Sequence, residues 1–103
     1  MPIRWLPHEA VFEDDFSTKT DVYSFGALVW ELFTRAEMPF HRLNDAAVIS
    51  AMEKRELQWK TPKNASPQVM ALLGRCWADC PRDRPTFAQI ITAISELPSD
   101  AGT

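Results

Sequence analysis

The residues of this sequence whose types and spacing could support chemistry are few. Cys76 and Cys80 are its only two cysteines, and a four-residue spacing would place both thiols on one face of a helix. Such a pair could bind a metal or form a redox couple, but a zinc site needs two further Cys or His ligands. No second cysteine pair or paired histidine completes that set. Two reduced core thiols are therefore the favoured interpretation.

The histidines and glycines also fail to form a known catalytic motif. His8 precedes Glu9, which is half of an H-E-x-x-H zinc motif without its second histidine, and His41 stands alone between helices. The three glycines lie far apart, so there is no Gly-rich phosphate loop, and no G-x-S-x-G elbow occurs. None of these catalytic motifs is therefore complete in this sequence.

Three charged residues each have a structural and a functional interpretation. Asp21 is favoured as part of a helix-opening capping box with Thr18, although it could instead be a buried acceptor that holds a backbone segment absent from this chain. Arg84 precedes Pro85, which restricts it to extended backbone and turns it away from the helix that follows. A distant carboxylate could receive Arg84, and Glu9, beside an apolar stretch, is the most isolated candidate.

Length and charge exclude several classes of function. The chain has 103 residues, a formal net charge of −3 and 46% hydrophobic residues, as expected for at most one globular domain. Eleven basic residues against fourteen acidic ones, with no basic run longer than a pair, argue against nucleic-acid or anionic-membrane binding. No segment has the length of a membrane span or the pattern of a signal peptide. Partners must therefore be recognised by shape rather than by a large net charge.

The apolar periodicity predicts an all-helical chain with four main helices. We expect them at about residues 18–34, 45–55, 66–77 and 86–97, the third opened by Ser66-Pro67 and the fourth by a capping box of Thr86 with Gln89. The fourth helix should bury Phe87, Ile90, Ile91, Ile94 and Leu97 and stop at Pro98. Residues 2–12 read as extended with a helical turn at 8–12, and Phe40 and Trp59 read as buried anchors of loops. No strand is expected.

The helix at residues 18–34 is apolar on every side, which is unusual because a surface helix shows a polar stripe. It should therefore lie in the middle of a larger structure. The other helices are too few and too short to surround it, and the one at 45–55 is weakly amphipathic and reads as a surface helix. The chain thus looks like part of a larger domain, with packing partners for this helix outside these residues.

Three motifs resemble the C-terminal lobe of protein kinases, in the tyrosine-kinase branch. Residues 2–9 (P-I-R-W-L-P-H-E) are similar to the substrate-docking loop that runs into the A-P-E motif. Residues 21–26 (D-V-Y-S-F-G) resemble D-V-W-S-F-G, and residues 76–87 match C-W-x-x-x-P-x-x-R-P-[TS]-F. The resemblance implies a partial kinase domain at 1–97, with a central apolar helix and three further helices, and a flexible tail at 98–103.

The resemblance also implies roles for individual residues. Asp21 would hold the backbone of the catalytic loop, and Glu9 and Arg84 would form a buried ion pair, with Trp5 and Trp77 as further structural residues. The docking loop and the helix that begins at Asp45 would contact substrates or partners. The docking residues that it implies are Pro2, Ile3, Arg4, Trp5, Val48 and Met52.

Catalysis is not implied for these residues alone, because the family's Gly-rich loop, V-A-I-K lysine, H-R-D loop and D-F-G aspartate all precede this region. ATP and magnesium would be cofactors only if the parent domain is active. Pro7 and His8 replace the alanine and proline of A-P-E, and Ala36 stands where the family usually has glycine in T-x-G-x-x-P.

These departures fit relaxed catalytic demands. With them, the segments Glu37-Met38-Pro39 and Trp5-Leu6-Pro7 resemble the off-track and colon carcinoma kinase group of catalytically defective receptor tyrosine kinases. That group implies a signalling scaffold or co-receptor on the cytoplasmic side of the plasma membrane, with the rest of the kinase domain, receptors and signalling proteins as partners. Two alternatives remain. One is the docking part of an active tyrosine kinase, and the other is an independent helical interaction module.

Overall fold

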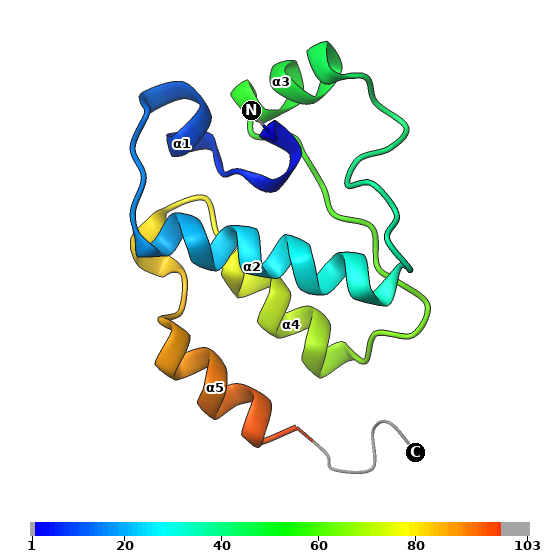
Figure 1. The fold of residues 1–103 in the computed structure, drawn as a ribbon, viewed down its shortest axis with the longest axis vertical. Coiled ribbons are helices and arrows are strands. Elements are labelled where there is room, and N and C mark those ends of the chain that lie inside the picture. The colour runs from blue at the N-terminus through cyan, green and yellow to red at the C-terminus, as the bar shows by residue number, and fades with distance from the viewer. Residues whose placement is uncertain (1, 98–103) are drawn as a thin grey trace.

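The computed structural model describes residues 2–97, which fold into helices joined by loops (Figure 1). The helices are α1 (His8–Glu13), α2 (Thr18–Phe33), α3 (Asp45–Glu53), α4 (Pro67–Cys76) and α5 (Phe87–Ser95), with 3-10 turns at Ile3–Trp5 and Pro81–Asp83. No strand occurs between residues 2 and 97. The all-helical prediction is therefore confirmed, whereas the predicted stop at Pro98 and the tail at 98–103 lie outside the described residues.

Helix α2 runs through the middle of the molecule, with α3 on one side of it and α5 on the other (Figure 1). It begins one residue earlier than the capping prediction implies. Ser17 has extended backbone and is the N-cap, its side chain accepts from the backbone of Lys19, and the reciprocal bond of its capping box comes from Thr20. The predicted capping box of Thr18 with Asp21 is wrong, because Thr18 is already helical. The caps of α4 at Ser66 and of α5 at Thr86 are as predicted.

Three helices end in left-handed backbone without a glycine. Asp14 after α1 has φ 51°, Arg35 and Ala36 after α2 have φ 60° and 67°, and Arg55 after α3 has φ 60°. At α2 the amide of Ala36 donates to the carbonyl of Glu31 at 2.8 Å, the long bond of a Schellman cap. Side chains with a Cβ are strained in this region, so each such end costs folding free energy.

We predict that Ala36→Gly stabilises the fold by about 0.5–1 kcal/mol, because glycine tolerates φ 67° and alanine does not. The measurement is the urea midpoint in the longest stable form of the protein that contains residues 2–97. Ala47→Gly, inside α3 with ordinary helical backbone, is the matched control and should destabilise by about 1 kcal/mol. Equal shifts for the two variants would contradict the strain at position 36.

The core is formed on one side of α2 only. Val22 packs with Leu72 and Cys76 of α4 and with Ile90 of α5 in one buried cluster. On the opposite side of α2, Leu28 is 54% exposed and Leu32 is 73% exposed. The described residues therefore cover only part of a helix whose sequence is apolar all round.

Helix α5 is the least covered helix, and the prediction of its burial is mostly wrong. Ile90 is buried, but Phe87, Ile91 and Ile94 are exposed and Leu97 is half-buried. The physical reason is that α5 packs on α2 and α4 along one edge, and no described segment lies against its other side. The loop anchors Phe40 and Trp59 are half-buried.

Two boundary predictions also need correction. Helix α3 ends at Glu53, two residues before Arg55, because Arg55 adopts left-handed backbone. Helix α4 ends at Cys76, so Cys80 does not share a helix face with it. Both cysteines are free thiols, but only Cys76 is buried in the core, and burial raises its pKa. Cys80 is half-buried, so the prediction of a core thiol is wrong for Cys80.

Candidate functional site: a buried ion pair and an arginine staple

Glu9 and Arg84, which are 75 residues apart in sequence, meet in a bidentate ion pair. Arg84 Nη1 donates to Glu9 Oε2 at 2.7 Å, and Arg84 Nη2 donates to Glu9 Oε1 at 3.0 Å. The two residues are 2% and 6% exposed. Glu9 comes from α1 and Arg84 follows the second 3-10 turn, so this pair joins the two ends of the described chain.

The remaining donors of Arg84 are used by the backbone around it. Its Nε donates to the carbonyl of Ala78 at 2.8 Å, and Nη1 also reaches the carbonyl of Lys19 at 3.2 Å. Its guanidinium lies 5.3 Å from the ring centroid of Tyr23. A buried charge with its lone pairs and donors satisfied in this way is tolerated, whereas a buried charge without a partner is costly.

Tyr23 of α2 is buried beside this ion pair, under the Arg84 guanidinium. Burial raises the pKa of its phenol to about 12. Tyr23 stands where the family's motif has tryptophan, so an aromatic ring is kept at this position.

Arg4 is a second buried arginine, and it fastens the N-terminal segment to the loop between α2 and α3. Its Nη1 donates to the carbonyls of Pro39 and Phe40 at 3.0 and 2.8 Å, and its Nη2 donates to the carbonyl of Leu43 at 2.8 Å. Nη2 also lies 2.9 Å from Asp45 Oδ1 at the start of α3. We call this set of contacts the Arg4 staple.

We predict that Arg4→Lys destabilises the fold by about 1–2 kcal/mol, because one ammonium group cannot reach three carbonyls and a carboxylate at the positions that the planar guanidinium occupies. Urea unfolding of the longest stable form measures the loss. Arg82→Lys, at an exposed arginine, is the control and should change stability by less than about 0.5 kcal/mol. A loss at position 4 no larger than at position 82 would mean that the staple contributes nothing.

Burial argues against the predicted docking role of Arg4 and of two residues of α3. Arg4 is 6% exposed, and Val48 and Met52 of α3 are 0% and 5% exposed. Their side chains face the interior, because α3 packs on α1 and on the first 3-10 turn. The structure therefore gives these three residues an internal packing role instead of the predicted docking role.

The other docking residues lie nearer the surface. Pro2 is exposed, and Ile3 and Trp5 are half-buried. Trp5 is also tied to α2, since its Nε1 donates to Glu31 and its carbonyl accepts from Ser24 Oγ at 2.7 Å. A docking role for these three residues stays a prediction.

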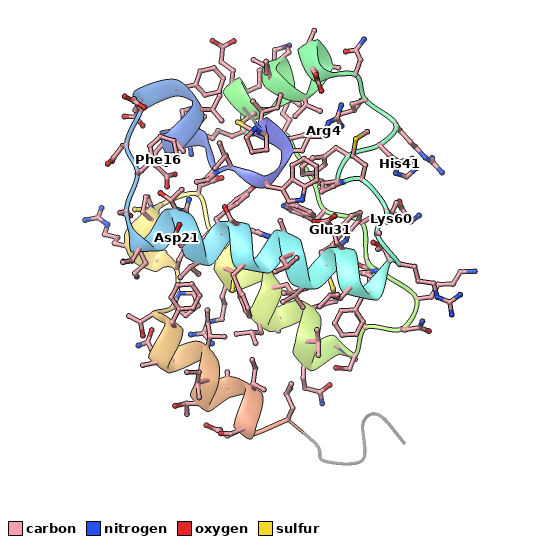
Figure 2. All side chains as sticks on the ribbon, in the orientation of Figure 1. Arg4, Phe16, Asp21, Glu31, His41 and Lys60 are labelled. Carbon is pink, nitrogen blue, oxygen red and sulfur yellow. The ribbon has the colours of Figure 1, made fainter. Side chains whose placement is uncertain are left out.

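Asp21 lies exposed in the first turn of α2, away from the Arg4 staple (Figure 2). Its side chain takes no part in the capping box, and no hydrogen bond to it is found within residues 2–97. The structure thus does not bring Asp21 together with Glu9 and Arg84. Its predicted role, holding a loop that this chain does not contain, stays a prediction.

Trp77 belongs to an aromatic cluster that joins four segments. It stacks on Trp59 at 4.1 Å with an interplanar angle of 6°. The ring of Trp59 also meets Trp30 at 5.3 Å and Phe40 at 4.6 Å. The sequence identified Trp77 and Trp59 separately, but neither periodicity nor motif spacing indicates that they stack, because one lies in a loop.

The described residues do not fit the binding of ATP and magnesium. No group of His, Cys, Asp and Glu side chains within residues 2–97 could hold a metal ion, and no glycine-rich turn is present to approach a phosphate. No chemical step can therefore be derived through these cofactors from the residues present.

The helices pack around α2, the three motifs follow in the family's order, and the Glu9–Arg84 pair connects the first motif with the third. This combination defines the lower part of the C-terminal lobe of a protein kinase. A family model for protein tyrosine and serine/threonine kinases matches residues 1–94, and the chain belongs to this family. The predicted family is thus confirmed.

Curated relatives narrow the similarity to one group. The chain is 43% identical to inactive tyrosine-protein kinase 7 of Gallus gallus and 39% identical to that of Homo sapiens, in each case over 98% of this chain. It is 33% identical to tyrosine-protein kinase-like otk of Drosophila melanogaster, again over 98% of this chain. These matches confirm the predicted off-track and colon carcinoma kinase group. The chain spans 9–10% of the length of these relatives.

Within residues 2–97, no helix is long and apolar enough to cross a membrane.

Proposed function

We propose that this chain is part of a catalytically inactive, receptor-type tyrosine-kinase-like protein that acts through protein contacts. The observation that carries the proposal is its 43% identity to a relative named as an inactive tyrosine-protein kinase. As part of such a protein, the chain would lie on the cytoplasmic side of the plasma membrane. There it would contribute to a signalling scaffold or co-receptor, with receptors and signalling proteins as partners.

The replacement of the alanine and proline of the A-P-E motif supports this proposal. His8 stands at the position of the motif's proline, and its ring lies 4.7 Å from that of Phe12 while its Nδ1 lies 3.2 Å from Arg55 Nη2. The neighbouring Glu9 nevertheless keeps its pair with Arg84. A contact that maintains the fold is therefore retained beside a position where the family's catalytic motif has changed, as relaxed selection on catalysis would allow.

The first partner of these residues would be the rest of the kinase domain. Asp21, Leu28 and Leu32 are exposed and are spaced by seven and four residues, so they form one stripe along α2. Beside α2, a wholly apolar cavity of about 150 Å³ opens between α2, α4 and α5. Contiguous exposed apolar surface on a globular protein is typical of a contact site. We assign it to the kinase polypeptide outside residues 2–97, with Asp21 as the acceptor at one end.

The behaviour of the isolated 103-residue chain tests this assignment. We expect a broad thermal transition together with binding of a dye that reports exposed apolar surface, because one side of α2 lacks neighbours. A sharp cooperative transition without dye binding would contradict the assignment. It would favour the alternative of an independent helical module.

A phosphorylation assay on the full-length protein separates the inactive kinase from an active one. Incubated with ATP, magnesium and a tyrosine-containing peptide, the protein should transfer no more phosphate than a heat-denatured sample. Transfer above that control would overturn the proposal. It would favour the substrate-docking part of an active tyrosine kinase, for which the position near the surface of exposed Pro2 and half-buried Ile3 and Trp5 is the supporting observation. An intact H-R-D and D-F-G in the full-length sequence would point the same way.

A further inference from the structure

A cavity beside the aromatic cluster and the Arg4 staple has no role in the contacts discussed so far. It has a volume of about 420 Å³ and is formed by the loop after α2, by α3 and by the segment after α3. Its apolar lining includes Trp30, Phe40, Leu43, Leu57 and Trp59. A volume of this size with mostly apolar walls is typical of a site for a small organic molecule.

The cavity lies on the covered side of α2. Trp30 lines it and is 1% exposed, and at about 100° per residue it points away from Leu28 and Leu32 on the opposite side of the helix. In Figure 2, His41 and Lys60, which also line the cavity, lie near Arg4 on the side of α2 that faces α3. The cavity is therefore separate from the apolar stripe that we assign to the rest of the kinase domain.

One polar group in the cavity wall has unused capacity to accept hydrogen bonds. Oε1 of Glu37 is shielded from solvent and accepts no hydrogen bond of acceptable geometry, although His41 Nδ1 lies 2.8 Å away and Lys60 Nζ 3.7 Å away. The Glu37 side chain as a whole is 27% exposed. A buried acceptor without a hydrogen bond costs free energy, and a ligand donor at this carboxylate would offset that cost.

The charges around the cavity indicate a neutral ligand. Glu37 and Glu56 are balanced by Arg42 and Lys60 when His41 is neutral. Neither a cation nor an anion is therefore favoured by net charge. Flat aromatic molecules fit walls made of aromatic rings, because offset and edge-to-face contacts add to the burial of apolar area.

We propose that this cavity binds a small, flat, neutral aromatic molecule that donates an N–H hydrogen bond to Glu37. The Arg4 staple holds the loop that carries Glu37, Phe40 and Leu43, so the site is preformed when the N-terminal segment is in place. This function is independent of the proposed inactive-kinase role, since it uses none of the residues that distinguish an active from an inactive kinase.

Indole and 1-methylindole are the matched probes, because methylation removes the N–H donor and leaves the ring system unchanged. Saturation-transfer NMR with the full-length protein should show saturable binding of indole, with affinity for 1-methylindole at least fivefold weaker. Glu37→Met, which removes both acceptor oxygens and keeps a side chain of similar length, should reduce this preference to less than twofold, and Glu53→Met, at an exposed glutamate outside the cavity, should leave it unchanged. Absence of indole binding, or equal affinity for the two probes, would overturn the proposal.

A second variant shows where the probe binds. Leu43→Trp places a larger side chain in the wall of the cavity at a residue that is 37% exposed, where it can be accommodated without disrupting the core. We expect it to weaken indole binding at least fivefold while the urea midpoint stays within the range of the unmodified protein. Unchanged indole binding in this variant would place the probe elsewhere and would refute the assignment.

Discussion

Arg84→Ala is expected to destabilise the fold by about 3–5 kcal/mol, the largest loss that any single substitution discussed here should cause. The substitution leaves the Glu9 carboxylate buried, with 6% exposure and without its bidentate partner. Glu9→Ala should cost a similar amount for the reciprocal reason. Urea unfolding of the longest stable form measures both losses.

A double-mutant cycle distinguishes this pair from two independent contributions. Once one partner is absent, removal of the other should cost much less, so the double variant should be far more stable than the sum of the single losses implies. Arg82→Ala is the control for arginine removal, since Arg82 is exposed two residues away. Additive losses for Glu9 and Arg84 would show that their contact does not contribute to stability.

Gly26→Ala should destabilise the fold by about 1–3 kcal/mol, although alanine is the better helix former. A Cβ at this position would lie 2.8 Å from Trp77 Nε1 and 3.1 Å from Cys76 Cβ. The Trp77 ring cannot move aside easily, because it stacks on Trp59. The glycine therefore permits the close approach of α2 and α4.

Gly74→Ala is the control, since it makes the same substitution on a helix in the same molecule. No atom lies within 4 Å of a Cβ built there, so we expect a gain in stability of about 0.5–1 kcal/mol. Opposite signs at positions 26 and 74, measured by urea unfolding, support the packing argument. A gain at both positions would contradict it.

Local patterns in the sequence predicted the helices well, because each helix start depends on a few adjacent residues. Ser66-Pro67 and the pair of Thr86 with Gln89 act within one turn, and both caps form as expected. The cap of α2 was misassigned since Ser17 and Thr18 are equally good N-cap residues, and only the backbone of Ser17 decides between them. The left-handed residues at the helix ends are not glycines, so no residue type in the sequence indicated where these helices stop.

Burial was predicted less well, because it depends on which segments pack together. The exposed Ile91 and Ile94 are apolar residues at helical spacing, and nothing in that spacing indicates that one side of α5 lacks a neighbour. Val48 and Met52 show the opposite error: they were predicted to be available for docking but are buried. A helix on the surface still packs one of its faces against the protein. Arg4 was assigned to docking through the resemblance of residues 2–9 to the family's substrate-docking loop. Its burial could not be predicted, because its carbonyl acceptors lie in a loop whose backbone cannot be inferred from side-chain types.

The meeting of Glu9 with Arg84 could be inferred only through the family resemblance. From the residues alone, each was one of many charged side chains, and a separation of 75 residues leaves no local signal of contact. The cavity beside Glu37 gave no signal at all, since its walls come from segments that no periodicity joins.

The stacked indoles of Trp59 and Trp77 have a spectroscopic consequence. Two parallel rings at 4.1 Å couple their excited states, so the folded chain should carry an exciton signal that neither ring produces alone. That signal reports one tertiary contact, between the loop after α3 and the end of α4, rather than helix content. It would disappear when this contact opens, even while every helix remains formed, which gives the protein an internal optical marker of packing.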